Sequence, residues 1–331
     1  MECRAKWHFR VAQVIALATT MFVLQAQTKE EGPWWPHPIW GEGDQAGASN
    51  WITASKVLSA VNLVKNGIVY EIGQIYEKGM PLYGKRTFSI VVPDPGPPVG
   101  KNQLVSNDEF VCGEIGQIGT QFDGPGHIGT RLKMADGTHK SVFYNGFTQE
   151  NDIGGPYGLR KLGVENVKPI ITRGVLIDIV GFKGQATLPN SYEVSLADVK
   201  GALMKQGIDP DSISPGDALF FNYGWSKLWG NPVKYNFNPP GIGLEVAAWI
   251  ISLKPSMIGS DSWPTEVVPN PNPELLYPVH QELVTKNGIF NLENMVFEDL
   301  VRDRVYEFLF ILTPIRLKGA TGSPVRPIAI H

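Results

Sequence analysis

Amide, carboxylate and imidazole side chains are concentrated in residues 114–130, EIGQIGTQFDGPGHIGT. If the chain is extended from Gln117 to Asp123, the two-residue period of a strand places both of these residues and Gln121 on one face. A Gly-Pro-Gly turn then returns His127 toward Asp123. Such a set of oxygen and nitrogen atoms can hold a divalent ion of the Mg, Mn or Zn type. The spacing is equally compatible with a glycine-rich hairpin that buries a hydrogen-bond network.

Residues 117–127, QIGTQFDGPGH, resemble the pattern H-x-G-T-H-x-D-x-P-x-H. This is the signature of the cyclase family of metal-dependent hydrolases, to which kynurenine formamidase and isatin hydrolase belong. The matching positions are Gly119, Thr120, Asp123, Pro125 and His127. Glutamine replaces both leading histidines. Three further segments resemble the family in the same order along the chain, namely residues 40–51, 216–229 and 241–264. The resemblance covers most of residues 38–315, and the chain is identified as a member of this family.

The resemblance also implies a second pair of site residues nearer the C-terminus, a histidine followed about a dozen residues later by a glutamate. The residues that it assigns to the metal site are Asp123, His127, His280, Glu293, Gln117 and Gln121. The two glutamines bring a different ligand type, because imidazole favours zinc whereas amide and carboxylate oxygens favour manganese or magnesium. We expect Mn or Zn as the cofactor. The first metal position is then weak, holds manganese, or is empty beside a single ion nearer His127, His280 and Glu293.

The implied chemistry is hydrolysis, because a bound divalent ion acidifies water and polarises a carbonyl group. His127 is the candidate general base or proton shuttle, with metal ligation as its rival role. Asp123 would fix the ion or orient the water. Flat aromatic rings near the motifs would hold a flat or cyclic substrate, and we assign this role to Phe122, Trp263 and Trp40.

The expected function is therefore that of a metal-dependent hydrolase, which attacks a cyclic or aromatic amide, lactone or ester with metal-activated water. Two alternatives stay open. One is a catalytically silent relative that binds a small ligand through the altered site. The other is a metal-dependent cyclase or lyase, because elimination or ring closure uses the same polarised carbonyl.

Strands alternate with helices along the chain, which predicts an α/β class. The resemblance implies a swivelling β/β/α fold, with a mixed-sheet or barrel-like core flanked by helices. We predict helices over residues 55–65, 195–206, 244–253 and 278–286. We predict strands over residues 68–75, 89–92, 174–180, 217–223, 257–260, 289–292 and 308–313. No linker interrupts this series, so residues 27–331 are expected to form a single domain.

The first 26 residues have the order of a secretory signal: a basic start, an apolar run from Val11 to Leu24, and a small residue, Ala26. The run is shorter than the roughly 20 apolar residues that a membrane span needs. We expect cleavage of residues 1–26 and an exported protein, periplasmic or secreted, without a membrane anchor. Beyond this segment the only cysteine is Cys112, expected in the apolar core.

Charge and composition limit the partners. The formal net charge is −3, so the 331-residue chain has no general basic field to attract nucleic acid. With 43% apolar and 18% charged residues, it is also not a disordered chain. We expect a small-molecule substrate, and a homo-oligomer, either a dimer or a tetramer.

Overall fold

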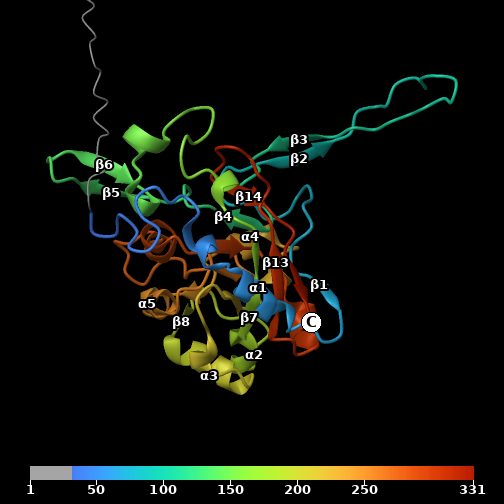
Figure 1. Ribbon diagram of the computed structural model, residues 1–331. Helices are drawn as coiled ribbons and strands as arrows, with labels where there is room; N and C mark the ends of the chain where they lie inside the picture. The colour runs from blue at the N-terminus through green and yellow to red at the C-terminus, as the bar shows by residue number, and fades with distance from the viewer. Residues whose placement is uncertain (1–31) are drawn as a thin grey trace, which may run out of the picture. The chain divides into compact units, whose positions relative to one another are not determined.

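Nine strands form one mixed sheet at the centre of the structure, a computed structural model that describes residues 32–331 (Figure 1). Their order across the sheet is β1 (Val69–Glu71), β15 (Ile328–Ile330), β13 (Glu307–Leu312), β7 (Ile170–Asp178), β9 (Ala218–Asn222), β11 (Met257–Ser260), β12 (Phe290–Glu293), β4 (Gln121–Asp123) and β14 (Gly322–Pro324). The predicted signal segment, residues 1–26, lies outside the described residues.

The middle of this sheet is parallel and its flanks are antiparallel. β7, β9, β11 and β12 run parallel to one another, while β13 pairs antiparallel with β7 and β4 pairs antiparallel with β12. The parallel strands are buried on both faces, which explains continuous apolar runs such as ALFF at residues 218–221. The sheet curls into a half-barrel with helices packed on it, and this confirms the predicted α/β fold.

Alternation along the strands divides the core into two apolar clusters. In β9, Leu219 and Phe221 belong to one cluster together with residues of α2, α3 and α5. Phe220, between them, points to the opposite face, where it packs against Phe308 and Phe310 of β13. The helices are α1 (Ala54–Val61), α2 (Ile179–Lys183), α3 (Leu196–Lys205), α4 (Pro232–Asn236), α5 (Leu244–Leu253), α6 (Pro278–His280) and α7 (Glu298–Arg302).

Short elements complete the chain. The 3-10 turns are η1 (Gly47–Trp51), η2 (Tyr144–Gly146), η4 (Val164–Asn166), η5 (Pro210–Ser212) and η6 (Trp225–Leu228), and the π-helical turns are η3 (Gln149–Ile153) and η7 (Gln281–Lys286). Three two-stranded sheets pair β8 (Glu193–Val194) with β10 (Gly241–Ile242), β2 (Phe88–Val91) with β3 (Phe110–Gly113), and β5 (Thr130–Lys133) with β6 (His139–Val142). Among these, β2 and β3 begin a long hairpin that projects from the body (Figure 1).

Several predicted elements have the bounds that local sequence signals gave them. Ser195 caps α3, and its hydroxyl accepts from the N–H of Asp198 while the Asp198 carboxylate accepts from the Ser195 N–H. The predicted helix over residues 278–286 is instead divided into one α-turn, α6, and the π-helical turn η7. Such π segments often occur at functional sites.

One prediction about local geometry is wrong. The chain is not extended from Gln117 to Asp123, because Gly119 has a φ of 55° and β4 begins only at Gln121. Glycine adopts this left-handed conformation without the steric cost that a Cβ atom would cause. Cys112 is also misassigned, since it lies exposed on β3 rather than in the apolar core.

A membrane-spanning helix would need a long apolar segment. None of the helices within residues 32–331 has both the length and the hydropathy to cross a bilayer.

Candidate metal centre

Cross-strand pairing assembles the centre of the site. In the antiparallel pair β4–β12, Asn291 lies opposite Asp123, and Glu293 lies opposite Gln121. Residues two apart on a strand share a face, and directly paired residues share it across the ladder. The register therefore brings four polar side chains together on one face, although about 170 residues separate the two strands in sequence.

His280, the last residue of α6, reaches this group from outside the sheet. Its Nδ1 lies 2.5 Å from Glu266 Oε1, and the Glu266 carboxylate also accepts hydrogen bonds from the backbone N–H groups of Val279 and His280. A carboxylate oxygen accepts, so the Nδ1 proton points to Glu266 and Nε2 faces Asp123 and Glu293, where it can offer its lone pair to an ion once the Nε2 proton is displaced. This is the orientation in which histidines bind metal ions.

Asp123, His280 and Glu293 offer ligand atoms that all lie within 4.8 Å of one another, and all three residues are buried. His280 Nε2 is 3.2 Å from Glu293 Oε1 and 3.7 Å from Asp123 Oδ2. Two carboxylates and one imidazole form a ligand set suited to a divalent ion such as Mn or Zn.

Asn291 supports the same conclusion. Its side-chain amide donates to Asp123 Oδ2 at 3.1 Å and to Glu293 Oε1 at 2.7 Å. The amide oxygen, Oδ1, is buried and has no hydrogen-bond partner among the described residues. A buried acceptor without a donor is costly, and a water molecule or a cation beside Oδ1 would satisfy it. The residues present therefore fit a bound cation.

Two residues of the triad, Glu293 and His280, hold their protons more tightly than usual, because negative charge accumulates in the site. Burial and the neighbouring Asp123 raise the pKa of Glu293 to about 7. Burial lowers the pKa of His280, but its contacts with Asp123, Glu266 and Glu293 outweigh this effect and raise it well above its usual value. Protons or a metal ion must therefore balance the clustered carboxylates.

Asp123 behaves differently from Glu293. Burial opposes its ionisation, but the charges of His127 and His280 and the hydrogen bonds from His280 and Gln117 lower its pKa to about 2. Asp123 therefore carries a negative charge near neutral pH and is a candidate ligand for a cation.

The structure places His127 beside the triad rather than within it. Its Nε2 lies 3.8 Å from Asp123 Oδ1, and the side chain lines the pocket that leads to the triad. Burial lowers the pKa of His127, although Asp123 raises it in part. A neutral imidazole at this position can accept a proton near neutral pH.

The two glutamines donate hydrogen bonds to the carboxylates of the triad. Gln117 Nε2 donates to Asp123 Oδ1 at 2.7 Å, and Gln121 Nε2 donates to Glu293 Oε2 at 2.5 Å. Gln121 Nε2 also lies 3.2 Å from Gln117 Oε1. The glutamines therefore lie at the predicted place, but their amide nitrogens face the carboxylates.

A pocket of about 150 Å³ opens onto the triad. Trp263 stacks on Tyr83 with ring centroids 4.1 Å apart, and Tyr277 meets Trp263 edge-on at 6.2 Å. The guanidinium group of Arg86 lies 5.6 Å from the centre of the Tyr83 ring. Trp263 thus lies where the sequence analysis placed it, in the wall of the candidate substrate pocket.

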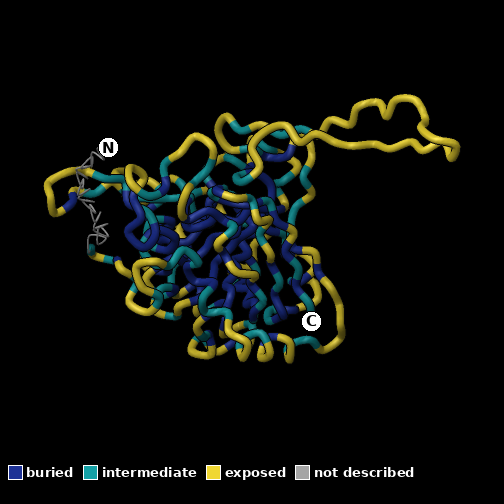
Figure 2. The backbone as a smooth tube through the Cα atoms, turned by 45° about the horizontal axis from the view of Figure 1, so that its top comes forward, coloured by how far each residue is buried: buried dark blue, intermediate teal, exposed yellow. Residues whose placement is uncertain are grey.

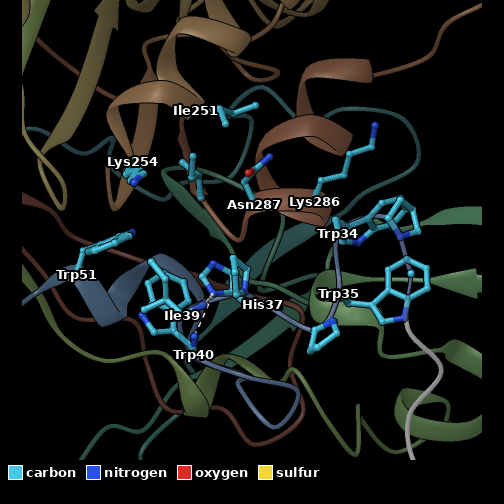
Figure 3. A pocket seen from close by; sticks show the side chains of 15 residues that line it. Trp34, Trp35, His37, Ile39, Trp40, Trp51, Ile251, Lys254, Lys286 and Asn287 are labelled. Atoms are coloured by element: carbon cyan, nitrogen blue, oxygen red, sulfur yellow. Dashed lines mark hydrogen bonds between the residues drawn. The ribbon is translucent and has the colours of Figure 1, made fainter.

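Two aromatic assignments need correction. Phe122 is fully buried on the other side of β4, where it packs against Phe290, because the residues on either side of it face the centre. Trp40 does not line the triad's pocket. It stacks on His37 in a larger hollow of about 550 Å³, which is lined by Trp34, Trp51, Lys254 and Lys286 (Figure 3).

Sequence reasoning missed Glu266, Asn291, Tyr83, Arg86 and Tyr277. Asn291 had a usable signal, because it lies two residues before Glu293 on a predicted strand and must share its face. Glu266 follows Trp263-Pro264 in an irregular segment, where no periodicity marks it. Tyr83 and Arg86 come from the irregular segment before β2, and only the folded chain shows their approach to the site.

The profile of the Cyclase family, described as "Putative cyclase", matches residues 37–267. This chain belongs to the Cyclase family. A solved structure titled as a novel cyclase is 30% identical to this family member, with a TM-score of 0.77, and the match covers 88% of this chain and 96% of that one.

More distant structures share the fold of this Cyclase family member. Isatin hydrolase A from Ralstonia solanacearum is 18% identical, with a TM-score of 0.58 over 84% of this chain and 98% of that one. Isatin hydrolase A from Labrenzia aggregata, bound to benzyl benzoate, is 17% identical, with a TM-score of 0.57 over 83% and 97% of the two chains. A comparison with curated protein sequences gave no match.

Proposed function

We propose that this Cyclase family member is a metal-dependent hydrolase of a cyclic or aromatic amide, lactone or ester. The observation that carries the proposal is the buried triad of Asp123, His280 and Glu293 at the base of an aromatic pocket. The isatin hydrolases that share its fold support a carbonyl substrate of this kind. Manganese and zinc are the candidate ions, because the ligands combine two carboxylates with one imidazole.

A divalent ion bound there would polarise the substrate carbonyl and acidify a water molecule. His127 is placed to act as the base, since its imidazole borders both the pocket and Asp123. It takes a proton from the water and returns it to the leaving nitrogen or oxygen atom. The Asp123 carboxylate, 3.8 Å from Nε2 of His127, can stabilise the positive charge that His127 gains with the proton, and Glu266 keeps His280 in its ligand orientation.

The pocket walls favour a small flat ring. Trp263, Tyr83 and Tyr277 provide aromatic faces, and a volume of about 150 Å³ leaves room for little more than one ring system. Arg86 adds a positive charge at the same wall. Hydrolysis of an amide or ester creates a carboxylate, and the guanidinium group can stabilise it.

A screen of lactones, cyclic imides, formamides and aromatic esters with Mn- or Zn-loaded protein tests the proposal. Proton release from ester or lactone substrates, and absorbance change from ring opening, report turnover. Turnover that disappears in Asp123→Asn and His127→Gln variants supports the proposal. Ligand-dependent thermal stabilisation without turnover of any compound would instead favour a silent binding protein.

One specific observation favours the alternative that the protein binds a small ligand without catalysis. Gln117 and Gln121 direct their amide nitrogens at the carboxylates of the triad, and these hydrogen bonds compete with a metal ion for Asp123 and Glu293. Metal-dependent cyclisation or elimination at the same carbonyl is a further alternative, and analysis of the reaction products distinguishes it from hydrolysis.

We also propose that the protein is exported to the periplasm or secreted after removal of residues 1–26, and that it acts on a small molecule rather than on nucleic acid. The basic start and apolar run of the leader support export. N-terminal sequencing of the native protein should find a start near Gln27, and retention of Met1 would contradict export by cleavage.

A further inference from the structure

The hollow that contains Trp40 is separate from the pocket of the candidate metal centre. Its volume is about 550 Å³, against about 150 Å³ for that pocket, and the two share no lining residue. This volume lies within the range of roughly 300–1,000 Å³ that is typical of small-molecule sites. Residues 32–40, which supply much of the lining, are mostly exposed or half-buried (Figure 2). A ligand can therefore reach the hollow from solvent.

Aromatic rings form one side of the hollow (Figure 3). The Trp40 indole lies parallel to the His37 imidazole, with ring centroids 4.0 Å apart and an interplanar angle of 5°, and it meets Trp51 edge-on at 5.2 Å. Ile251 and Ile289 add apolar surface to the lining. Aromatic faces hold other flat rings by stacking and edge contacts. This lining favours a flat aromatic ligand.

Two lysine side chains bring positive charge to the same hollow. Lys254 Nζ lies 6.0 Å from the centre of the Trp51 ring, and Lys286 Nζ lies 5.7 Å from the centre of the Trp34 ring. Lys286 also pairs with Glu282 at 2.5 Å, whereas the Lys254 ammonium group has no hydrogen bond or ion pair within residues 32–331. Among these residues no aspartate or glutamate lines the hollow. The charge of the lining therefore favours an anion.

The hydrogen-bonding groups of the hollow are mainly donors. Nδ1 of His37 accepts the N–H groups of Ile39 at 3.3 Å and Trp40 at 3.2 Å, and burial lowers the pKa of His37, although Asp44 opposes this in part. The neutral ring therefore carries its proton on Nε2, which has no hydrogen-bond partner in the described part of the chain. The buried indole N–H of Trp34 has no acceptor there either. This surplus of donors favours a ligand with acceptor oxygen atoms.

We propose that the hollow is a second small-molecule site, which binds a flat aromatic carboxylate. The ring of the ligand packs against Trp40 and Trp51, and its carboxylate pairs with the Lys254 ammonium group. Lys286 offers a second cation at the Trp34 end of the hollow. Hydrogen bonds between charged groups are stronger than those between neutral ones, so the carboxylate contributes affinity and orientation together. The inference does not depend on the reaction proposed above, because the two sites share no residue.

Isothermal titration of the purified protein with 2-naphthoate tests the proposal, and 2-naphthamide, a neutral compound with the same rings, is the matched ligand. Wild-type protein should bind the naphthoate about fivefold more tightly than the naphthamide, because only the naphthoate forms an ion pair. Lys254→Gln combined with Lys286→Gln should abolish this difference. Lys200→Gln combined with Lys318→Gln removes the same charge at two exposed lysines outside the hollow, and it should keep the wild-type preference.

Two further variants locate the bound ligand. Trp40→Ala should weaken the binding of both compounds about two- to tenfold, because the ligand loses an aromatic contact. Trp263→Ala, in the pocket of the metal centre, should leave both affinities unchanged. A melting curve checks the folding of each variant, and the exposed position of Lys254 makes the lysine pair the variant that tests the site even if Trp40→Ala is unstable.

Three results would overturn the proposal. The first is wild-type protein that binds the naphthoate no better than the naphthamide. The second is a preference that survives the loss of Lys254 and Lys286, or that disappears in Trp263→Ala, since the ligand would then lie elsewhere. The third is binding that appears only after Glu30→Gln and Glu31→Gln, because the acidic chain before Gly32 would then be the occupant of the hollow.

Discussion

The Nδ1 atom of His280 lies 2.5 Å from Oε1 of Glu266, and the same carboxylate accepts the backbone N–H groups of Val279 and His280. Glu266 thus fixes both the start of α6 and the ring orientation of its histidine. This contact directs Nε2 of His280 at Asp123 and Glu293, so one buried carboxylate outside the triad sets the orientation of the triad's histidine.

Glu266→Gln should weaken metal binding about 10- to 100-fold, because a neutral amide with a single acceptor oxygen replaces the charged carboxylate that orients the ring of His280 and increases its basicity. Isothermal titration with Mn²⁺ or Zn²⁺ measures the change. Glu282→Gln is the matched control, since Glu282 lies nearby in η7 but pairs with Lys286 at the partly exposed surface. Equal affinities for the wild-type protein and Glu266→Gln would show that Glu266 only caps α6.

Replacing both Gln117 and Gln121 with histidine should tighten zinc binding relative to manganese, because imidazole is the better zinc ligand. Competition between the two ions, followed by metal analysis, measures this preference. The leucine pair, Gln117→Leu with Gln121→Leu, should lower metal affinity or turnover if the amides serve the site. A folded leucine variant with unchanged metal content and turnover would show that these positions have lost their role.

Metal affinity should rise with pH through about 7, because the pKa of Glu293 is raised to about 7 and an ion must displace this proton. His280, whose pKa is also raised, acts in the same direction. Below pH 7, each increase of one pH unit should lower the dissociation constant for Mn²⁺ about tenfold for each proton that the ion displaces. Titrations in buffers of different ionisation enthalpy measure the released protons. An affinity that is flat from about pH 5.5 to 7 is inconsistent with the raised pKa of Glu293.

The same shift affects the stability of the metal-free protein. A carboxyl group whose pKa is higher in the folded state stabilises the fold fully at low pH, and it loses this contribution as pH rises through about 7. Metal-free protein should therefore melt at lower temperature at about pH 8 than at about pH 6. Glu293→Gln should reduce this difference, and an unchanged difference would assign it to other groups.

Phe122 and Trp263 should respond differently to truncation. Phe122→Ala removes a fully buried ring from the core and should cost about 3–5 kcal/mol of unfolding free energy. Trp263→Ala removes a pocket wall, and loss of a ring contact worth about 0.5–1.5 kcal/mol should raise KM about two- to tenfold. Denaturant unfolding and steady-state kinetics separate these effects. A Phe122→Ala protein with unchanged stability and a raised KM would show that Phe122 contacts the substrate.

Local sequence signals predicted some elements well, and three-dimensional contacts decided the others. α5 and β11 have their predicted bounds, because Gly243 and Lys254 flank the mostly apolar run of α5 and Ser256 precedes β11. Asp123, His280 and Glu293 could be identified from the family signature and the His–Glu spacing. The position of His127 outside the triad could not be identified in this way, because it depends on the left-handed turn at Gly119 and on the short strand β4. Glu266 acts through a contact across 14 residues of irregular chain, which no periodicity indicates.

Metal content after equilibrium dialysis tests the central claim most directly. Wild-type protein dialysed against Mn²⁺ or Zn²⁺, and then against metal-free buffer, should retain at least one ion per chain by mass spectrometry. Asp123→Ala and Glu293→Gln should retain less than about a tenth of this amount, because each removes a charged ligand from a three-ligand set. His139→Gln, at an exposed histidine on β6, should retain the wild-type amount. Wild-type protein that retains no ion, or triad variants that retain as much as the wild type, would contradict a metal centre at Asp123, His280 and Glu293.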